Sequence, residues 1–288
     1  MIRAQNSSDS ETIFSVSVMS KDIWLNGLIA KDFLVSDDDH VQAITSFETG
    51  ESPISVSFLI DKSGSTTDVS LNAIPATLLA FVKASNPKNE YSLVTFDSEL
   101  HVLLEASQDT KIIENTIEKL SQTRPSGNTQ LFDSMNTCLN KLSKAKFKRR
   151  VLIIFSDTFD NVSKMGLGDL TNVVKRSSVL IYNIRIYDSR LIASSDTLSI
   201  AQLHAMDDLV DRTGGKVFLS TKRTVLNENL KWIADDLRNQ YVIGLRPTNK
   251  SIANGKKWHK VEIKIDPSKK RTLGGKIIIR TRRGYYAE

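Results

Sequence analysis

The chain has 288 residues, of which 40 % are hydrophobic and 25 % are charged, and its formal net charge is +6. This is ordinary globular composition, sufficient for one large domain or for one with a smaller companion. A single cysteine, Cys138, excludes an intrachain disulfide and a zinc site built on several thiolates. We expect Cys138 to be a small buried residue of a helix.

No segment approaches the roughly 18 apolar residues of a membrane-spanning helix. The polar first residues, MIRAQNSSDSET, lack the apolar stretch of a signal peptide. We therefore expect a soluble protein, either cytoplasmic or the mature part of an exported one.

Residues 1–52 show the alternation of apolar and polar residues that is typical of strands with one solvated face. Phe14, Val16 and Val18 alternate with serines, and further short strands are predicted at 32–36 and 41–47.

Residues 53–240 instead alternate between continuous apolar strands and amphipathic helices. Strands are predicted at 56–60, 91–96, 101–105, 150–155, 179–186 and 216–220. Helices are predicted at 69–84, 110–121, 130–145, 167–177, 198–212 and 224–239. This order predicts a doubly wound α/β domain with a mostly parallel sheet covered on both faces, the Rossmann-like class.

Residues 241–288 return to alternation, with strands predicted at 241–245, 258–265 and 276–281. Neither terminal segment has enough strands to be stable alone. We therefore expect both to join in one small antiparallel β domain, in which the α/β domain is an insertion. The excess of positive charge lies in this last segment, where Lys and Arg alternate with residues such as Val261 and Ile263. That pattern favours a solvated strand face and no specific nucleic-acid site.

Oxygen-bearing side chains follow three of the predicted strands. The first strand ends in DKSGS, which contains Asp61, Ser63 and Ser65. Thr129 begins a later helix, and Asp157 follows the strand RVLIIF. In an open α/β sheet, ligands bind beyond the carboxyl ends of the strands, so these residues are expected to converge. An all-oxygen set suits Mg²⁺, Mn²⁺ or Ca²⁺.

Taken by itself, DKSGS could also have a purely structural role as a turn and helix cap, because Asp and Ser accept hydrogen bonds from free backbone N–H groups. Asp133 and Asp160 are candidates for acids that support the metal ligands without binding the ion themselves. Asp133 equally suits the first turn of a helix, where an acid faces the helix dipole. Asp97 is expected to serve a hairpin turn. The four histidines are scattered without ligand spacing, and we assign them no role.

DKSGS, Thr129 and Asp157 together resemble the metal-ion-dependent adhesion site of von Willebrand factor type A domains, read as D-x-S-x-S, a threonine and an aspartate. The flanks resemble a bacterial branch, the von Willebrand factor A-related acidobacterial domain, through LIAKDFLVSDDDHVQAITSF, LRNQYVIGLRPT and IIIRTRRGYYA. Lys62 and Thr158 depart from the family pattern, Thr158 replacing a frequent glycine. The branch implies an exported, periplasmic or extracellular protein.

The resemblance implies that the hydroxyls of Ser63, Ser65 and Thr129 bind the ion while Asp61 and Asp157 act largely through water. A Glu or Asp carboxylate of a protein partner then completes the coordination. The implied function is metal-dependent protein binding, in adhesion or as a scaffold. One alternative is a structural adaptor with a vestigial metal site. An enzyme is disfavoured, because a haloacid dehalogenase-type phosphotransferase requires D-x-D where Ser63 stands, and no nucleophile elbow or phosphate-binding loop occurs.

Overall fold

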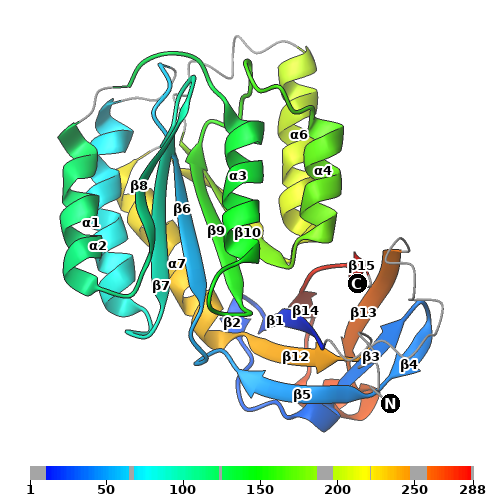
Figure 1. The fold of residues 1–288 in the computed structure, drawn as a ribbon. Coiled ribbons are helices and arrows are strands. Elements are labelled where there is room, and N and C mark those ends of the chain that lie inside the picture. Colours follow the sequence, from blue (N-terminus) through cyan, green and yellow to red (C-terminus); the bar gives the residue numbers. More distant parts are fainter. Residues whose placement is uncertain are drawn as a thin grey trace, which may run out of the picture. The chain divides into compact units, whose positions relative to one another are not determined.

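The computed structural model describes residues 11–64, 68–122, 125–186, 197–220, 222–246 and 258–286 (Figure 1). The chain divides into two compact units. One unit, the α/β unit, contains residues 53–238, and the other, the β unit, contains residues 1–52 and 239–288. Within the described residues, no helix is both long enough and apolar enough to cross a membrane.

The α/β unit is built on a sheet of six strands in the order β11-β10-β9-β6-β7-β8. The strands are β6 (Ser55–Asp61), β7 (Glu90–Phe96), β8 (Leu100–Ser107), β9 (Arg150–Ser156), β10 (Val179–Ile186) and β11 (Lys216–Ser220). All neighbouring pairs are parallel except β7 and β8, which form an antiparallel hairpin at one edge. The α/β architecture is thus confirmed, with a mixed sheet.

Helices cover both faces of this sheet (Figure 1). They are α1 (Asp68–Ala84), α2 (Thr110–Glu118), α3 (Leu131–Ser143), α4 (Leu167–Arg176), α6 (Thr197–Arg212) and α7 (Arg223–Asn239). Successive residues of β6 point to opposite faces, so Phe58 and Ile60 pack with α1, α2 and α7, while Leu59 packs with α3, α4 and α6. Cys138 is fully buried on α3, as expected. The double cover explains why these strands read as uninterrupted apolar runs.

The β unit consists of two antiparallel sheets. One has the order β14-β1-β12-β5, with β2 paired to β1, and the other has the order β15-β13-β3-β4. The strands are β1 (Thr12–Ser20), β2 (Ile23–Trp24), β3 (Phe33–Asp37), β4 (His40–Gln42), β5 (Ile44–Thr49), β12 (Tyr241–Leu245), β13 (Trp258–Ile265), β14 (Ile277–Arg280) and β15 (Gly284–Tyr286). Phe14, Val35, Ile243 and Ile263 belong to one core, to which both sheets contribute.

Three details of the β unit differ from the expectations. The strand predicted at 41–47 is two strands, because β4 pairs with β3 and β5 pairs with β12 of the other sheet. A short helix, α8 (Pro267–Leu273), was not expected, although Asp266 caps it and Pro267 occupies its first turn. The short strands β2 and β15 were also missed.

Strand β13 bears out the solvated-face interpretation of the basic segment. Val261, Ile263 and Ile265 are buried, whereas Lys260 and Lys264 are exposed. The positive charge along this strand therefore lies on its solvent side.

Candidate functional site

The carboxyl ends of β6 and β9 lie next to each other, because these strands are parallel and paired up to Ile60 and Phe155. Asp61 ends β6, is fully buried, and accepts hydrogen bonds through both carboxylate oxygens. The backbone N–H of Ser63 donates to Oδ1 at 2.8 Å, and the Ser156 hydroxyl donates to Oδ2 at 2.7 Å. Asp61 is thus held in one orientation at the end of the sheet.

Asp157, only 4 % exposed, follows β9 and interacts electrostatically with Asp61. Burial, and then the charge of Asp157, raise the pKa of Asp61 from 3.8 to about 6, against the opposing effect of hydrogen bonds from Ser63 and Ser156. Two buried carboxylates near each other are unfavourable without a compensating cation. The electrostatics at these strand ends, which we call the rim, therefore favour a bound positive charge.

A second loop lies against the turn that follows β6. The backbone N–H of Gly64 donates to the carbonyl of Gly127 at 3.1 Å, and that of Ser126 donates to the carbonyl of Lys62 at 2.9 Å. Gly127 adopts a left-handed conformation with φ of 77°, and a Cβ there would lie 2.7 Å from the hydroxyl of Ser98. Glycine at this position therefore allows the loop to pass close to Ser98 in the β7–β8 turn.

The same loop carries Thr129, which is 3 % exposed and lies against the loop after Asp157. Its backbone N–H donates to Oδ1 of Asn161 at 2.9 Å, and its carbonyl accepts from the N–H of Asn161 at 3.1 Å. Three segments that are distant in sequence, carrying Asp61 and Ser63, Thr129, and Asp157, thus meet at one rim. Ser65, the remaining predicted ligand, lies outside the described residues.

Lys62, which departs from the family pattern, is 6 % exposed, and its ammonium donates to the carbonyl of Leu120 at 2.8 Å. One N–H of its charged group is therefore engaged by the backbone that precedes the Thr129 loop.

The other acids near the rim support the backbone. Asp133 accepts from the N–H groups of Lys164 and Met165, at 2.9 and 3.0 Å. Asp160 accepts from the N–H of Phe132 at the start of α3. Their carboxylates therefore fasten the loop after β9 to α3. Asp97 accepts from the N–H of Glu99 in the β7–β8 turn, as expected.

Sequence reasoning missed three residues of this site: Ser156, Thr158 and Asn161. Thr158 has φ of 78°, which is rare for a β-branched residue, and its hydroxyl accepts from Asn183 at 2.9 Å and from Arg185 at 3.2 Å. The one signal in the sequence was the threonine standing where the family often has glycine, since glycine commonly marks a left-handed position.

The residues present fit a hard divalent ion. The described donors are two hydroxyls and two carboxylates, all oxygen, and Mg²⁺, Mn²⁺ and Ca²⁺ prefer oxygen ligands. Neither histidine nor cysteine takes part among the residues described around this rim.

Residues 56–159 match the family model described as von Willebrand factor type A domain. The match includes Asp61, Thr129 and Asp157. A comparison with curated proteins found no match.

Solved structures with similar folds include the PilB minor pilin from Streptococcus sanguinis, with 16 % identity and a TM-score of 0.50 over 65 % of this chain and 61 % of the pilin. BatB from Bacteroides thetaiotaomicron has 11 % identity and a TM-score of 0.46 over 63 % of this chain and 98 % of BatB. The SpRpn10 VWA domain has 17 % identity and a TM-score of 0.47 over 62 % of this chain and 94 % of that domain. The match thus spans less than two thirds of the pilin. The family model and the α/β fold together identify residues 56–159 as part of a von Willebrand factor type A domain.

Proposed function

We propose that this protein is a divalent-metal-dependent protein-binding module, in adhesion or as a scaffold, that captures an acidic side chain of its partner. Von Willebrand factor type A domains commonly serve as protein-interaction modules. The observation that carries the proposal is the meeting of Asp61, Ser63, Thr129 and Asp157 at one edge of the sheet, with both carboxylates buried.

In this proposal the hydroxyls of Ser63, Ser65 and Thr129 hold the ion, and Asp61 and Asp157 orient water around it. When bound, Mg²⁺, Mn²⁺ or Ca²⁺ supplies an electrophilic centre that accepts a Glu or Asp carboxylate of the partner. The chain's own contribution is positioning. Asp61 is fixed by Ser63 and Ser156, and the Thr129 loop is fixed by Gly64 and Asn161.

The buried charges argue for an occupied site over a vestigial one. A rim that served only as a structural turn would have no need of two buried carboxylates, one of which has a raised pKa. We propose no enzymatic activity, because Ser63 occupies the position where a phosphotransferase of the D-x-D type carries its second acid.

We further propose that the α/β unit is an insertion in the β unit, which both ends of the chain build together. The pairing of β1 with β12 and with β14 supports this arrangement.

Calorimetric titration with Mg²⁺ tests the metal site. The wild-type chain should bind one ion, and its melting temperature should rise with ion concentration, because at a hundredfold excess over Kd binding adds about 2.7 kcal/mol to stability. Ser63→Ala should stay folded and lose this binding. Ser143→Ala, a control at an exposed position on α3, should bind as the wild type does.

Absence of binding by a folded wild-type chain, or equal binding by Ser63→Ala, would contradict the proposal. A second step tests the partner chemistry. In the presence of Mn²⁺, an immobilised chain should retain partners whose acidic residue is intact and lose them on substitution of that residue by its amide, or on chelation.

A further inference from the structure

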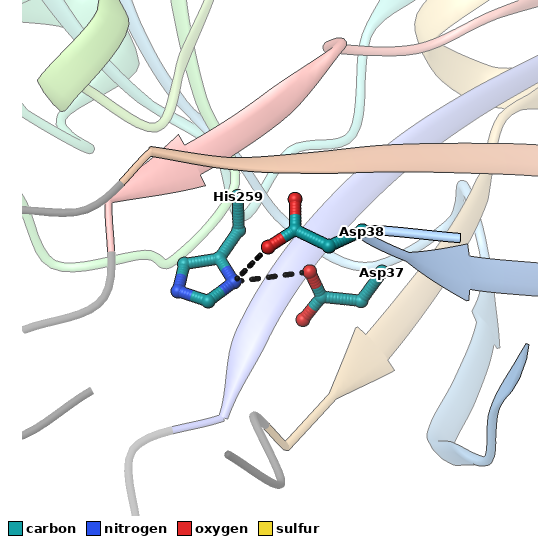
Figure 2. Close-up of side chains that lie close together, drawn as sticks. All are labelled: Asp37, Asp38 and His259. Carbon is teal, nitrogen blue, oxygen red and sulfur yellow. Dashed lines mark hydrogen bonds and ion pairs between the residues drawn. The ribbon is translucent and has the colours of Figure 1, made fainter. Parts of the chain in front are cut away.

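A second cluster of possible metal ligands lies within the β unit, and the site at the strand ends does not involve it. We name it the His259 cluster. It consists of Asp37 at the end of β3, Asp38 in the following turn, and His259 on β13 (Figure 2). Nδ1 of His259 lies 3.1 Å from Oδ1 of Asp37 and 3.2 Å from Oδ2 of Asp38. Figure 2 shows both carboxylates directed at this one nitrogen.

The second oxygen of each carboxylate is held from outside the cluster. The hydroxyl of Tyr285 donates to Oδ2 of Asp37 at 2.8 Å, and the backbone N–H of Lys260 donates to Oδ1 of Asp38 at 3.0 Å. The ring of Tyr285 also stacks on the imidazole of His259, with centroids 5.1 Å apart. Such outer contacts are what orient ligands around metal ions in proteins.

The separations suit a small divalent ion. Around a tetrahedral ion with ligand bonds near 2.0 Å, neighbouring ligand atoms are about 3.3 Å apart. The two measured separations approach that value, and all three ligand atoms lie within 4.8 Å of one another.

The cluster also concentrates negative charge. Asp37 and Asp38 bring two carboxylates to 3.1 and 3.2 Å from one nitrogen of His259, whose side chain is 1 % exposed. A divalent cation bound between them would offset both negative charges.

We propose that the His259 cluster binds a divalent transition-metal ion, with zinc as the best-fitting class, through Nδ1 of His259, Oδ1 of Asp37 and Oδ2 of Asp38. An imidazole nitrogen among the ligands distinguishes this site from the all-oxygen rim and selects against Mg²⁺ and Ca²⁺. In a tetrahedral site, water would fill the fourth position. The ion would join β3 to β13 at the start of the turn that follows β3.

Titration of the full chain with Co²⁺ tests this proposal, because four-coordinate Co²⁺ absorbs visible light far more strongly than the six-coordinate ion expected at an all-oxygen rim. The wild-type chain should develop intense bands that saturate at one Co²⁺ per chain and disappear on addition of Zn²⁺. Ser63→Ala should retain these bands, which separates the two sites. If the site at the strand ends proved not to bind metal, the Co²⁺ bands expected here would be unchanged.

Asp38→Asn should weaken Co²⁺ binding at least tenfold, as expected when a direct ligand is lost. Asp38 has φ of 46°, a conformation that asparagine tolerates, so the turn should be retained. Asp39→Asn is the matched control. It removes the same charge from the next residue, which has φ of 67° and is exposed outside the cluster.

Absence of intense bands in a folded wild-type chain would overturn the proposal, and so would equal affinities of the wild type and Asp38→Asn. Equal losses in Asp38→Asn and Asp39→Asn would also overturn it, because they would show a general effect of charge and no ligand role.

Discussion

Ser156 and Asp61 are joined across neighbouring parallel strands by a hydrogen bond of 2.7 Å from the serine hydroxyl to Oδ2 of the aspartate. The same serine oxygen accepts from the backbone N–H of Thr158 at 3.0 Å. Ser156 therefore links the acid at the end of β6 to the loop that carries Asp157.

Ser156→Ala should lower the stability of the folded chain by about 1–3 kcal/mol, because it removes a donor from a buried carboxylate and an acceptor from a buried N–H. It should also weaken Mg²⁺ binding, although Ser156 is not among the proposed ligands. Urea unfolding and calorimetry measure the two effects.

Ser134→Ala is the matched control for Ser156→Ala. Ser134 is also fully buried, but its hydroxyl makes no hydrogen bond within the described residues, so its removal should be close to neutral. Equal effects of the two substitutions would contradict the role given to Ser156.

The stability of the metal-free protein should depend on the protonation of Asp61. Between its ordinary pKa of 3.8 and its folded value of about 6, the folded chain keeps a proton that the unfolded chain has released. Stability should therefore fall as pH rises through this range, with a contribution of roughly 3 kcal/mol from this residue.

Urea denaturation in the presence of a chelator, compared between the wild type and Asp61→Asn, measures that contribution. The variant should show a shallower fall over the same range. Identical pH profiles would show that Asp61 does not titrate with a raised pKa.

Substitutions of Thr158 separate backbone strain from hydrogen bonding. Thr158→Ser keeps the hydroxyl that accepts from Asn183 and Arg185, and it should melt near the wild-type temperature. Thr158→Val keeps the branched shape but removes the acceptor from a buried guanidinium, and it should cost about 1.5–3 kcal/mol. Thr158→Gly should fall between them, because it relieves a left-handed conformation worth roughly 1–2 kcal/mol. A melting temperature of Thr158→Val as high as that of Thr158→Ser would show that the Thr158 hydroxyl does not contribute to stability.

Deletion of residues 1–50 should expose the apolar faces of the remaining strands of the β unit. Strand β1 pairs with β12 through Thr12–Val16 and with β14 through Ser17–Ser20, and β5 pairs with the other edge of β12. The deletion removes both β1 and β5, so β12 and β14 lose these neighbours. Sedimentation should show self-association, and the melting temperature should fall. A truncated chain that stays monomeric with the wild-type melting temperature would contradict the joint construction of this unit.

Much of the α/β unit could be predicted from sequence because its signals are local. The apolar runs that become β10 and β11 have the predicted bounds, and D-x-S-x-S begins at the last residue of β6. The contribution of Ser156 was hidden, because a serine at the end of an apolar strand has the same appearance whether or not it contacts an acid on the neighbouring strand.

The His259 cluster could not be predicted from ligand spacing, since His259 and Asp37 are 222 residues apart. Only the pairing of β13 with β3 brings them together. The change of sheet between β4 and β5 was missed for a related reason. A continuous run of strand-forming residues does not indicate which neighbour each part will find.

The two-part pairing of β1 has a consequence for biosynthesis. Its partners, β12 and β14, begin more than 200 residues later, at Tyr241 and Ile277. At roughly 5–20 residues per second, on the order of ten seconds or more separates their emergence from the ribosome. Throughout that interval, while the α/β unit is still being made, β1 has neither of these two partners and only the short strand β2 can pair with it. The first 52 residues are therefore where a chaperone would have most to protect during translation.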